Sequence, residues 1–338
     1  VEWNVMMRRV SVFFGWSLCG WLLLLGSTGW TADSAREGAA PAVDAPLLGH
    51  WTFDDVDDDA QGAEKAVVVP RVRGVHGMAA ELSGPHQLQT APLTASATLP
   101  EIAFSVWVKP VELADYRELF RQECPERLLF SFQHGGTILS LGLNINGYIE
   151  CDAEINPAQV LDGGWHHAAA TFDGQVMRVY LDGVEIGAQK RAGVIAVNKD
   201  VPAFIASSSG TSEHLQGALD DLRIYQRALT AAEVRGLYDQ GIASLAERFQ
   251  ELEQTAAEYY QPRETFAATL VSFRQTMMQH PDALADRELA GVILAKMKAD
   301  FPRDYDDYIA TLGSSPLEYL TANNHEALAA TAAGGEEA

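Results

Sequence analysis

Apolar and polar residues alternate over short stretches between Leu48 and Ile224, and this alternation predicts β-strands. In the clearest stretch Met177, Val179 and Leu181 fall on one side and polar or aromatic residues separate them. The preceding Asp173-Gly174 tolerates the positive φ angles of a tight hairpin. Because every stretch is short and is bounded by Gly, Pro, Asn or Asp, we expect an all-β sandwich of two antiparallel sheets.

The period of the apolar residues changes to that of helices near Gly241. Thr230-Ala231-Ala232-Glu233 has the spacing of a capping box and predicts a short helix through Leu237 that Gly241 stops. Three amphipathic stripes follow, at intervals of three or four residues. They consist of Ile242, Leu245, Phe249, Leu252, Ala256 and Tyr259, then of Phe266, Leu270, Phe273 and Met277, and then of Leu289, Val292, Ile293 and Met297. A short fourth helix is expected before Gly313. The stripes must pack on each other, on the sandwich or on a second copy of the chain, and the sequence leaves these three open.

The N-terminus has the residue order of a secretory signal: Arg8-Arg9, an apolar run from Val10 to Leu25, and then small residues. The run is short for a bilayer span, so we expect cleavage of the signal and export to the periplasm or the cell exterior. The expected organisation is a signal peptide at 1–32, a small-residue linker at 33–46, the sandwich at 47–241, a small all-α region at 242–322 and a flexible tail at 323–338.

Charge and cysteines narrow the partners and the covalent structure. The chain has 46 acidic and 24 basic residues, a net charge of −22, which argues against binding to a nucleic-acid backbone. An exported chain without its signal retains Cys124 and Cys151. These either form a disulfide or remain two buried thiols, and both alternatives stay open.

Four motifs stand in a fixed order along the predicted sandwich. They are residues 49–54 (Gly-His-Trp-Thr-Phe-Asp), 104–110 (Phe-Ser-Val-Trp-Val-Lys-Pro), the stretch from Gly164-Trp165-His166-His167 to Asp182-Gly183, and residues 217–233 with the core Leu-Asp-Asp-Leu-Arg-Ile-Tyr. Together they resemble the bacterial laminin-G-like, concanavalin A-like jelly-roll family over about half of the chain. The resemblance implies a two-sheet jelly roll that serves mainly as a binding module for glycans or for protein partners.

The resemblance also implies a structural calcium ion between the opening and closing strands. It nominates Asp54 and Asp220 as ligands, with backbone carbonyls of the 55–62 loop completing the shell. Calcium prefers six to eight oxygen ligands, and the loop is rich in aspartate. The alternative is a solvated acidic loop that binds no ion.

His166 and His167 are neighbours on a predicted strand, so they point to opposite faces and cannot chelate one ion together. We expect one of them to pack inside and the other to lie outside. Three tryptophans of the predicted strands, Trp51, Trp107 and Trp165, are expected in the core rather than against sugar rings.

Sugar contacts are expected on loops instead, around His86, Gln133-His134 or Ser207–His214. An enzymatic site is not predicted. A sandwich glycosidase would carry two glutamates and an aspartate alternating along one strand, and no Glu-x-Asp-x-x-Glu run occurs. The sequence also has no Gly-x-Ser-x-Gly, phosphate-loop or His-Glu-x-x-His motif.

The leading hypothesis is therefore an exported, non-catalytic protein whose sandwich recognises carbohydrate or another ligand outside the cytoplasm, with structural calcium as its one expected cofactor. A second hypothesis is a scaffold that self-associates through its C-terminal helices. The third is an unrecognised polysaccharide-active enzyme.

Overall fold

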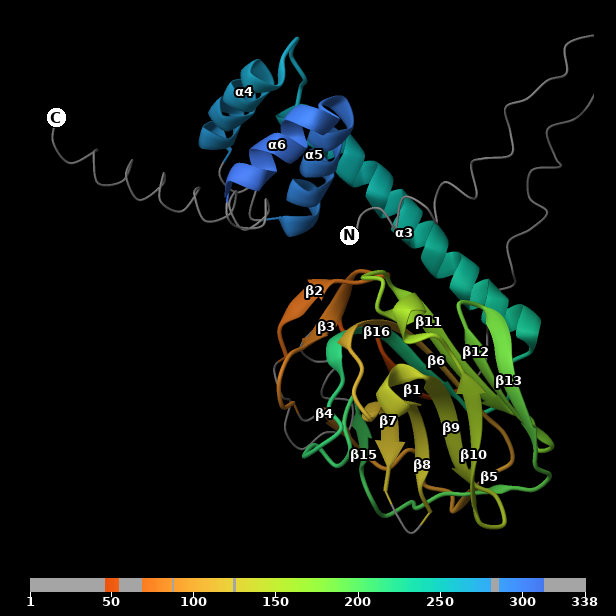
Figure 1. The fold of residues 1–338 in the computed structure, drawn as a ribbon. Coiled ribbons are helices and arrows are strands. Elements are labelled where there is room, and N and C mark those ends of the chain that lie inside the picture. The colour runs from red at the N-terminus through yellow and green to blue at the C-terminus, as the bar shows by residue number, and fades with distance from the viewer. Residues whose placement is uncertain (1–45, 55–68, 87, 124–125, 281–285, 313–338) are drawn as a thin grey trace, which may run out of the picture. The chain divides into compact units, whose positions relative to one another are not determined.

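The computed structural model describes residues 46–54, 69–86, 88–123, 126–280 and 286–312. Two compact units divide the chain after Leu245, and each is described here by itself (Figure 1). The expected signal peptide and tail, and all but the last residue of the expected linker, lie outside the described residues.

The first unit is the predicted sandwich of two large antiparallel sheets. The first sheet, sheet A, has the strand order β13-β12-β11-β6-β16-β3-β2, with β1 also pairing with β16. Its strands are β1 (Leu47–Trp51), β2 (Arg71–Arg73), β3 (Met78–Leu82), β6 (Ile102–Glu112), β11 (His166–Phe172), β12 (Val176–Leu181), β13 (Val184–Lys190) and β16 (Gln216–Tyr225).

The second sheet, sheet B, has the order β10-β9-β8-β7-β15-β4. Its strands are β4 (Leu88–Thr90), β7 (Tyr116–Gln122), β8 (Leu128–Gln133), β9 (Ile138–Asn144), β10 (Tyr148–Glu154) and β15 (Ala203–Ile205). A short pair, β5 (Thr98–Leu99) with β14 (Ile195–Ala196), a 3-10 turn, η2 (His134–Gly136), and one helical turn, α2 (Pro157–Val160), complete the described sandwich. The jelly-roll fold class predicted from the sequence is confirmed.

Apolar side chains from the inner faces of both sheets form one core. Phe104 on sheet A lies 5.6 Å from Phe120 and 5.9 Å from Phe130 of sheet B, between ring centres. The predicted hairpin is present: β11 pairs with β12, and Gly174 between them has φ 84°. The backbone amides of Gln175 and Val176 donate to Asp173 Oδ1, which stabilises the turn.

Helix α3 (Ala231–Tyr259) corrects the prediction made at Gly241. The capping box forms, because the amide of Glu233 donates to Thr230 Oγ1 and the amide of Thr230 donates to the Glu233 carboxylate. The helix continues through Gly241, however, instead of stopping there. A Cβ atom at this residue would lie 2.1 Å from Cζ2 of Trp107. The glycine is needed for close approach of the helix to sheet A and not for chain termination.

The second unit is helical and begins at Ala246 inside α3. It continues with α4 (Phe266–Gln279), α5 (Arg287–Asp300) and α6 (Pro302–Leu312). Most residues of the three stripes in this unit are buried: Phe249, Leu252, Ala256, Phe273, Met277, Leu289, Val292, Ile293 and Met297. The hydroxyl of Tyr260 donates to Asp300, and its ring contacts Phe273. In the described residues no helix has the length and apolarity needed to cross a membrane.

Candidate functional site

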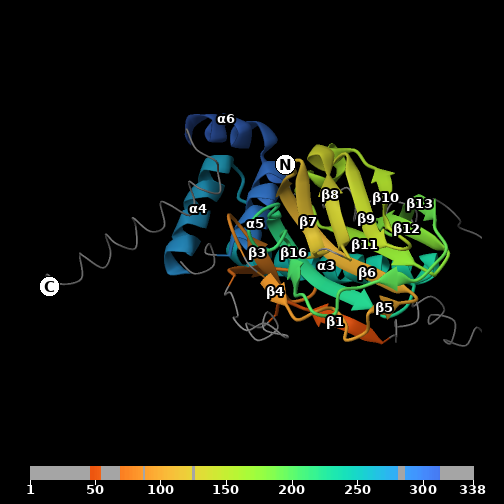
Figure 2. The ribbon, with the colours of Figure 1, turned by 90° about the horizontal axis from the view of Figure 1, so that it is seen from below.

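The outer face of sheet A is covered by the first part of α3, residues 231–245 (Figure 2). Trp107 of β6 stacks on Tyr238 of the helix, with 5.9 Å between ring centres and 17° between planes. Ser244 Oγ donates to the carbonyl of Val75 at 2.7 Å. Small and aromatic side chains of the sheet complete the contact with the helix: Ala103, Ala169, Tyr180 and Tyr225 cluster with Leu229, Val234 and Leu237. The part of this face around Ala103, Trp107 and Ala169 is therefore buried under the helix.

The two neighbouring histidines have different partners, as the prediction of opposite faces requires. His167 lies 2.9 Å from Ser105 Oγ through Nε2, and its ring is 5.2 Å from Trp107. His166 lies between Asp162 and Asp182. Both rings are fully buried, so the prediction of one outside histidine was wrong, because α3 covers the outer one. Burial lowers the pKa of His167 to about 4. Trp51, Trp107 and Trp165 are buried, as predicted.

The outer face of sheet B carries rows of residues that lie side by side on β7, β8, β9 and β10. Residues directly opposite each other on paired strands share one face of the sheet. The three rows are Glu118, Ser131, Ser140 and Asp152; then Arg121, Leu129, Gly142 and Glu150; and then Tyr116, Gln133, Ile138 and Glu154. The row on the opposite face is apolar and belongs to the core: Phe120, Phe130, Leu141 and Cys151.

An irregularity in β7 produces this arrangement. The register with β8 shifts between Glu118 and Phe120. One extra residue in a strand reverses the side to which the following side chains point. As a result Leu119 and Phe120 both enter the core, while Glu118 and Arg121 take part in one polar network.

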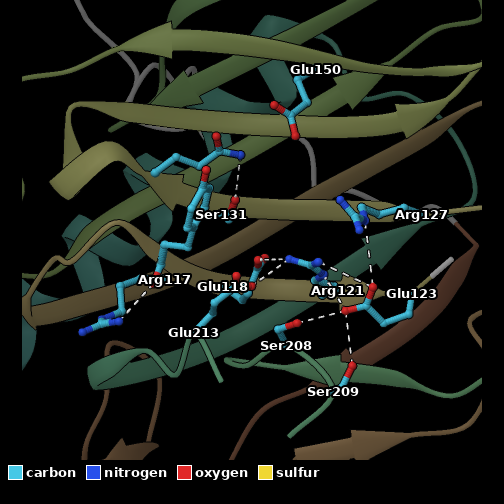
Figure 3. A network of polar contacts seen from close by, with 12 residues as sticks. Arg117, Glu118, Arg121, Glu123, Arg127, Ser131, Glu150, Ser208, Ser209 and Glu213 are labelled. Atoms are coloured by element: carbon cyan, nitrogen blue, oxygen red, sulfur yellow. Dashed lines mark hydrogen bonds and ion pairs between the residues drawn. The ribbon is translucent and has the colours of Figure 1, made fainter. Parts of the chain in front are cut away.

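That network surrounds a single guanidinium group (Figure 3). Arg121 Nη1 donates to Glu118 Oε1 at 2.6 Å and to Glu213 Oε2 at 2.8 Å, and Arg121 Nε lies 2.8 Å from Glu123 Oε1. Burial raises the pKa of Glu118 to about 8, with Glu213 adding to the rise and Arg121 opposing it. Burial raises the pKa of Glu123 as well, but Arg121 and the Ser208 hydroxyl outweigh it and hold that pKa below its ordinary value.

The segment 206–214 lies against β7 beside this network. Ser208 and Ser209 donate to Glu123 Oε1, and the amide of Glu118 donates to the carbonyl of Glu213. His86 Nε2 lies 2.9 Å from the carbonyl of Ala206. Two of the three regions predicted for sugar contacts, His86 and Ser207–His214, are thus brought together.

The two residues of the third region, Gln133-His134, have different surroundings. Gln133 lies on the outer face of sheet B and donates to Ser131 Oγ at 3.3 Å. His134 packs near Tyr116, with 6.1 Å between ring centres.

The edge strand β10 carries groups that the sequence search missed. The side chains of Glu150, Asp152 and Glu154 alternate with the buried Cys151 and Ala153. This run is Glu-x-Asp-x-Glu, and a search for Glu-x-Asp-x-x-Glu does not find it. The signal that could have revealed it was the strand period itself, which places every second residue on one face. Ser140 Oγ donates to Asp152 Oδ1 at 2.6 Å.

Tyr148 supplies an exposed aromatic ring on the same strand, with 40% of its surface accessible. Its hydroxyl donates to Glu150 Oε1 at 2.6 Å, and the Arg127 guanidinium lies 5.6 Å from the ring centre. A Cβ atom at Gly142 would lie 2.3 Å from the Tyr148 oxygen. The glycine therefore leaves the space in which the ring lies over β9.

The two predicted calcium ligands both bind the turn at residues 74–78. Asp54 Oδ1 accepts from the amide of Met78, and Asp220 Oδ2 accepts from the amides of Val75 and His76. Asp220 Oδ1 is buried and has no hydrogen-bond partner among the described residues, and burial raises the pKa of this carboxyl to about 7. An unpartnered buried carboxylate oxygen fits a cation ligand.

The described residues include only some of those in the calcium and disulfide predictions. Residues 55–62, which were expected to complete the calcium shell, lie outside the described residues. Among the residues that are described, no group of three or more His, Cys, Asp or Glu side chains is arranged to hold a metal ion. Cys124 of the predicted disulfide also lies outside them, and Cys151 is a buried free thiol.

Residues 83–235 match the model of the concanavalin A-like lectin/glucanases superfamily, in its laminin G branch. No curated protein matches the chain. Among solved structures, the chain is similar to domain 4 of AbnA, a GH43 extracellular arabinanase from Geobacillus stearothermophilus in complex with arabinotriose. The identity is 23%, the TM-score is 0.46, and the match covers 57% of this chain and 98% of that one.

Two further solved structures are similar to the chain at lower identity. The Ruminococcus gnavus IT-sialidase CBM40 bound to α2,3 sialyllactose is 11% identical with a TM-score of 0.39, over 47% of this chain and 96% of that one. The mouse laminin α1 chain domains LG4-5 are 12% identical with a TM-score of 0.37, over 49% of this chain and 45% of those domains.

Proposed function

Because residues 83–235 form a concanavalin A-like sandwich domain, we propose that the protein binds carbohydrate on the outer face of sheet B. One observation carries this proposal. Helix α3 covers sheet A around Trp107, whereas β10 of sheet B exposes Tyr148, Asp152 and Glu154 beside polar side chains of β7, β8 and β9 that are themselves buried. The lectins in the superfamily description support the same ligand class.

The chemistry of the face suits sugars. A sugar ring offers hydroxyl groups that donate and accept hydrogen bonds, and an apolar C–H face that packs on an aromatic ring. Glu150, Asp152 and Glu154 supply acceptors, Arg127 supplies donors, and Tyr148 supplies the ring. Tyr148 is already oriented by its bond to Glu150, which reduces the entropy lost on binding.

A glycan array probed with the full chain tests the proposal. We expect saturable binding to a restricted set of glycans, and a Tyr148→Ala variant should lose about tenfold in affinity with the stacking contact. The control is Leu161→Ala, which removes a side chain of similar exposure, 38%, from the residue that follows α2. Absence of binding to every glycan, or equal losses in both variants, would contradict the proposal.

The remaining parts of the proposal rest on sequence expectations. We propose that the chain is exported, on the signal-like order of residues 1–32. Asp54 and Asp220 would hold calcium, which would fix the 74–78 turn to β16. Self-association through the helical unit stays a prediction, and α4 does expose Val271 (57%) and Met278 (66%). Sedimentation of the full chain at increasing concentration tests it.

A polysaccharide-active enzyme is the second candidate, and the run on β10 is the observation that favours it. Successive outward residues of a strand are about 6.6 Å apart, within the roughly 5 to 9.5 Å that separates paired glycosidase carboxyl groups. A successive pair, either Glu150 with Asp152 or Asp152 with Glu154, would supply the acid and the nucleophile or base. This candidate requires release of reducing ends from a polysaccharide panel, and that release must be abolished in Asp152→Asn and in one of Glu150→Gln and Glu154→Gln. No release, together with glycan binding, leaves the non-catalytic function.

A further inference from the structure

Three carboxylates surround one cation on β7, and we call Glu118, Arg121, Glu123 and Glu213 the Arg121 cluster. The group is largely inaccessible: the side chain of Glu118 is 0% exposed, that of Arg121 10%, that of Glu123 27% and that of Glu213 29%. Arg127 lies 3.9 Å from Glu123, so with all groups ionised Glu118 and Glu213 would have Arg121 between them as their one shared cation. Burial of such uncompensated charge is costly, so uptake of a proton relieves it.

The geometry selects the pair of carboxyls that takes up this proton. Glu118 and Glu213 contact the same nitrogen, Arg121 Nη1, at 2.6 and 2.8 Å, so their carboxyl groups are adjacent. Glu118 Oε2 is buried with no hydrogen-bond donor among the described residues. Two carboxyl groups that share a site cannot both ionise at ordinary cost, and a proton between them satisfies the unpartnered oxygen.

We propose that Glu118 retains a proton beside the Glu213 carboxylate, and that this contact, bridged by Arg121, holds the segment 206–214 against β7 in a pH-dependent manner. Loss of the proton would place two adjacent anions on one nitrogen and repel Glu213 from the strand. The segment borders the outer face of sheet B, so its position would set the shape of one margin of the ligand surface. This consequence rests on the proposed function, whereas the proton-dependent contact does not.

Other charged groups face the cluster from its surroundings. Glu123 receives Ser208 and Ser209 from the segment and Arg127 from beyond β7, while Arg117 pairs with Glu112. On β8 the residue opposite Glu118 is Ser131, which does not titrate. His86 holds the start of the segment, and burial lowers its pKa. Substitution of Glu118 or Glu213 therefore tests the proposed contact and leaves these other charged groups unchanged.

Burial raises the pKa of Glu118 to about 8, which sets the direction of the effect. A carboxyl whose pKa is higher in the closed state stabilises that state fully below its ordinary pKa, near 4.5, and progressively less as the pH rises to 8. Opening of the segment should therefore become up to about tenfold more favourable per pH unit between pH 5 and 8.

Hydrogen exchange of the full chain, measured by mass spectrometry at pH 5, 6, 7 and 8 and corrected for intrinsic exchange rates, tests the inference without any ligand. We expect the protection factors of residues 207–213 to fall with pH in the natural protein. Glu118→Gln, which keeps the shape of a protonated carboxyl, should remove this dependence, as should Glu213→Gln on the segment itself. The control Glu81→Gln changes an exposed carboxylate of β3 and should retain it.

Flat protection in the natural protein, or an unchanged pH dependence in both Gln variants, overturns the inference. Failure of the glycan array would remove the proposed function alone, because the exchange measurement reads the segment directly.

Discussion

The two sheets of the sandwich have the same inner chemistry and opposite outer faces. Sheet A presents Ala103, Ala169 and Trp107 to the outside, and α3 packs on them with Gly241 against Trp107. Sheet B presents carboxylates, hydroxyls and Arg121 instead. Small residues beside aromatic rings admit a helix closely, whereas ionised groups would lose their water under one. The polar side chains of β7 and β8 are nevertheless buried, so the part of sheet B that we expect a ligand to reach is β10, which exposes Tyr148, Asp152 and Glu154.

The two sheets also differ in the direction in which burial shifts the pKa of a titratable side chain. His167 lies buried under α3, and burial lowers its pKa to about 4 although Asp182 and Asp221 oppose the shift. Glu118 on sheet B is buried among other carboxyls, and burial raises its pKa to about 8. The two faces should therefore lose stability at opposite ends of the pH range.

The largest expected effect comes from removing the contact between sheet A and α3. Trp107→Ala deletes a side chain that is 1% exposed, and should lower the free energy of unfolding by about 3–5 kcal/mol. Denaturant unfolding followed by circular dichroism measures this loss. Tyr148→Ala on sheet B is the matched change and should cost less than about 1 kcal/mol, because that ring is 40% exposed. Equal losses of unfolding free energy in the two variants would show that Trp107 and Tyr148 are packed equally tightly.

Acid should act on sheet A through His167. Its pKa is lower in the folded state, so its contribution is complete above the ordinary value of 6.5 and is lost as the pH falls toward 4, by about 3 kcal/mol. Denaturant unfolding at several pH values gives the slope. His167→Gln should be less stable at pH 7 but should show a shallower decline in acid. An unchanged decline would mean that other groups cause it.

Calcium should act at the Asp220 edge with a smaller effect. At pH 8 with a chelator, Asp220→Asn should raise the free energy of unfolding by about 1–2 kcal/mol, because it replaces an unpartnered buried carboxylate. Added calcium should raise the melting temperature of the natural protein and not that of the variant, since it binds only the folded state. Asp200→Asn, at an exposed carboxylate, is the control. If neither calcium nor chelator changes the melting temperature of the natural protein, the calcium site is excluded.

Strand alternation and turn residues were sufficient to predict the sandwich, because each strand has one apolar side and each hairpin a residue suited to its turn. The helical stripes were equally visible in the period of Leu289, Ile293 and Met297. Gly241 was misread because the same residue ends a helix or permits close packing, and only the position of Trp107 distinguishes the two.

The candidate site was less predictable for a similar reason. Arg121, Glu118 and Glu213 come from positions far apart in the sequence, and the shift in β7 that unites them leaves no clear pattern. The common face of Glu150, Asp152 and Glu154 could have been predicted, because every second residue of a strand points to the same side. The position of the Tyr148 ring depends on Gly142, which leaves space for it on β9. Gly142 pairs with Glu150 and not with Tyr148, so the sequence does not reveal this contact.

The central claim is that sheet B, and not sheet A, carries the ligand surface. Titration of the strongest glycan from the array into Asp152→Arg and Glu81→Arg tests it most directly, since both replace an exposed carboxylate on a strand, one in each sheet. The account predicts that Asp152→Arg weakens binding at least about tenfold and that Glu81→Arg binds like the natural protein. Unchanged affinity in Asp152→Arg together with loss in Glu81→Arg would contradict it.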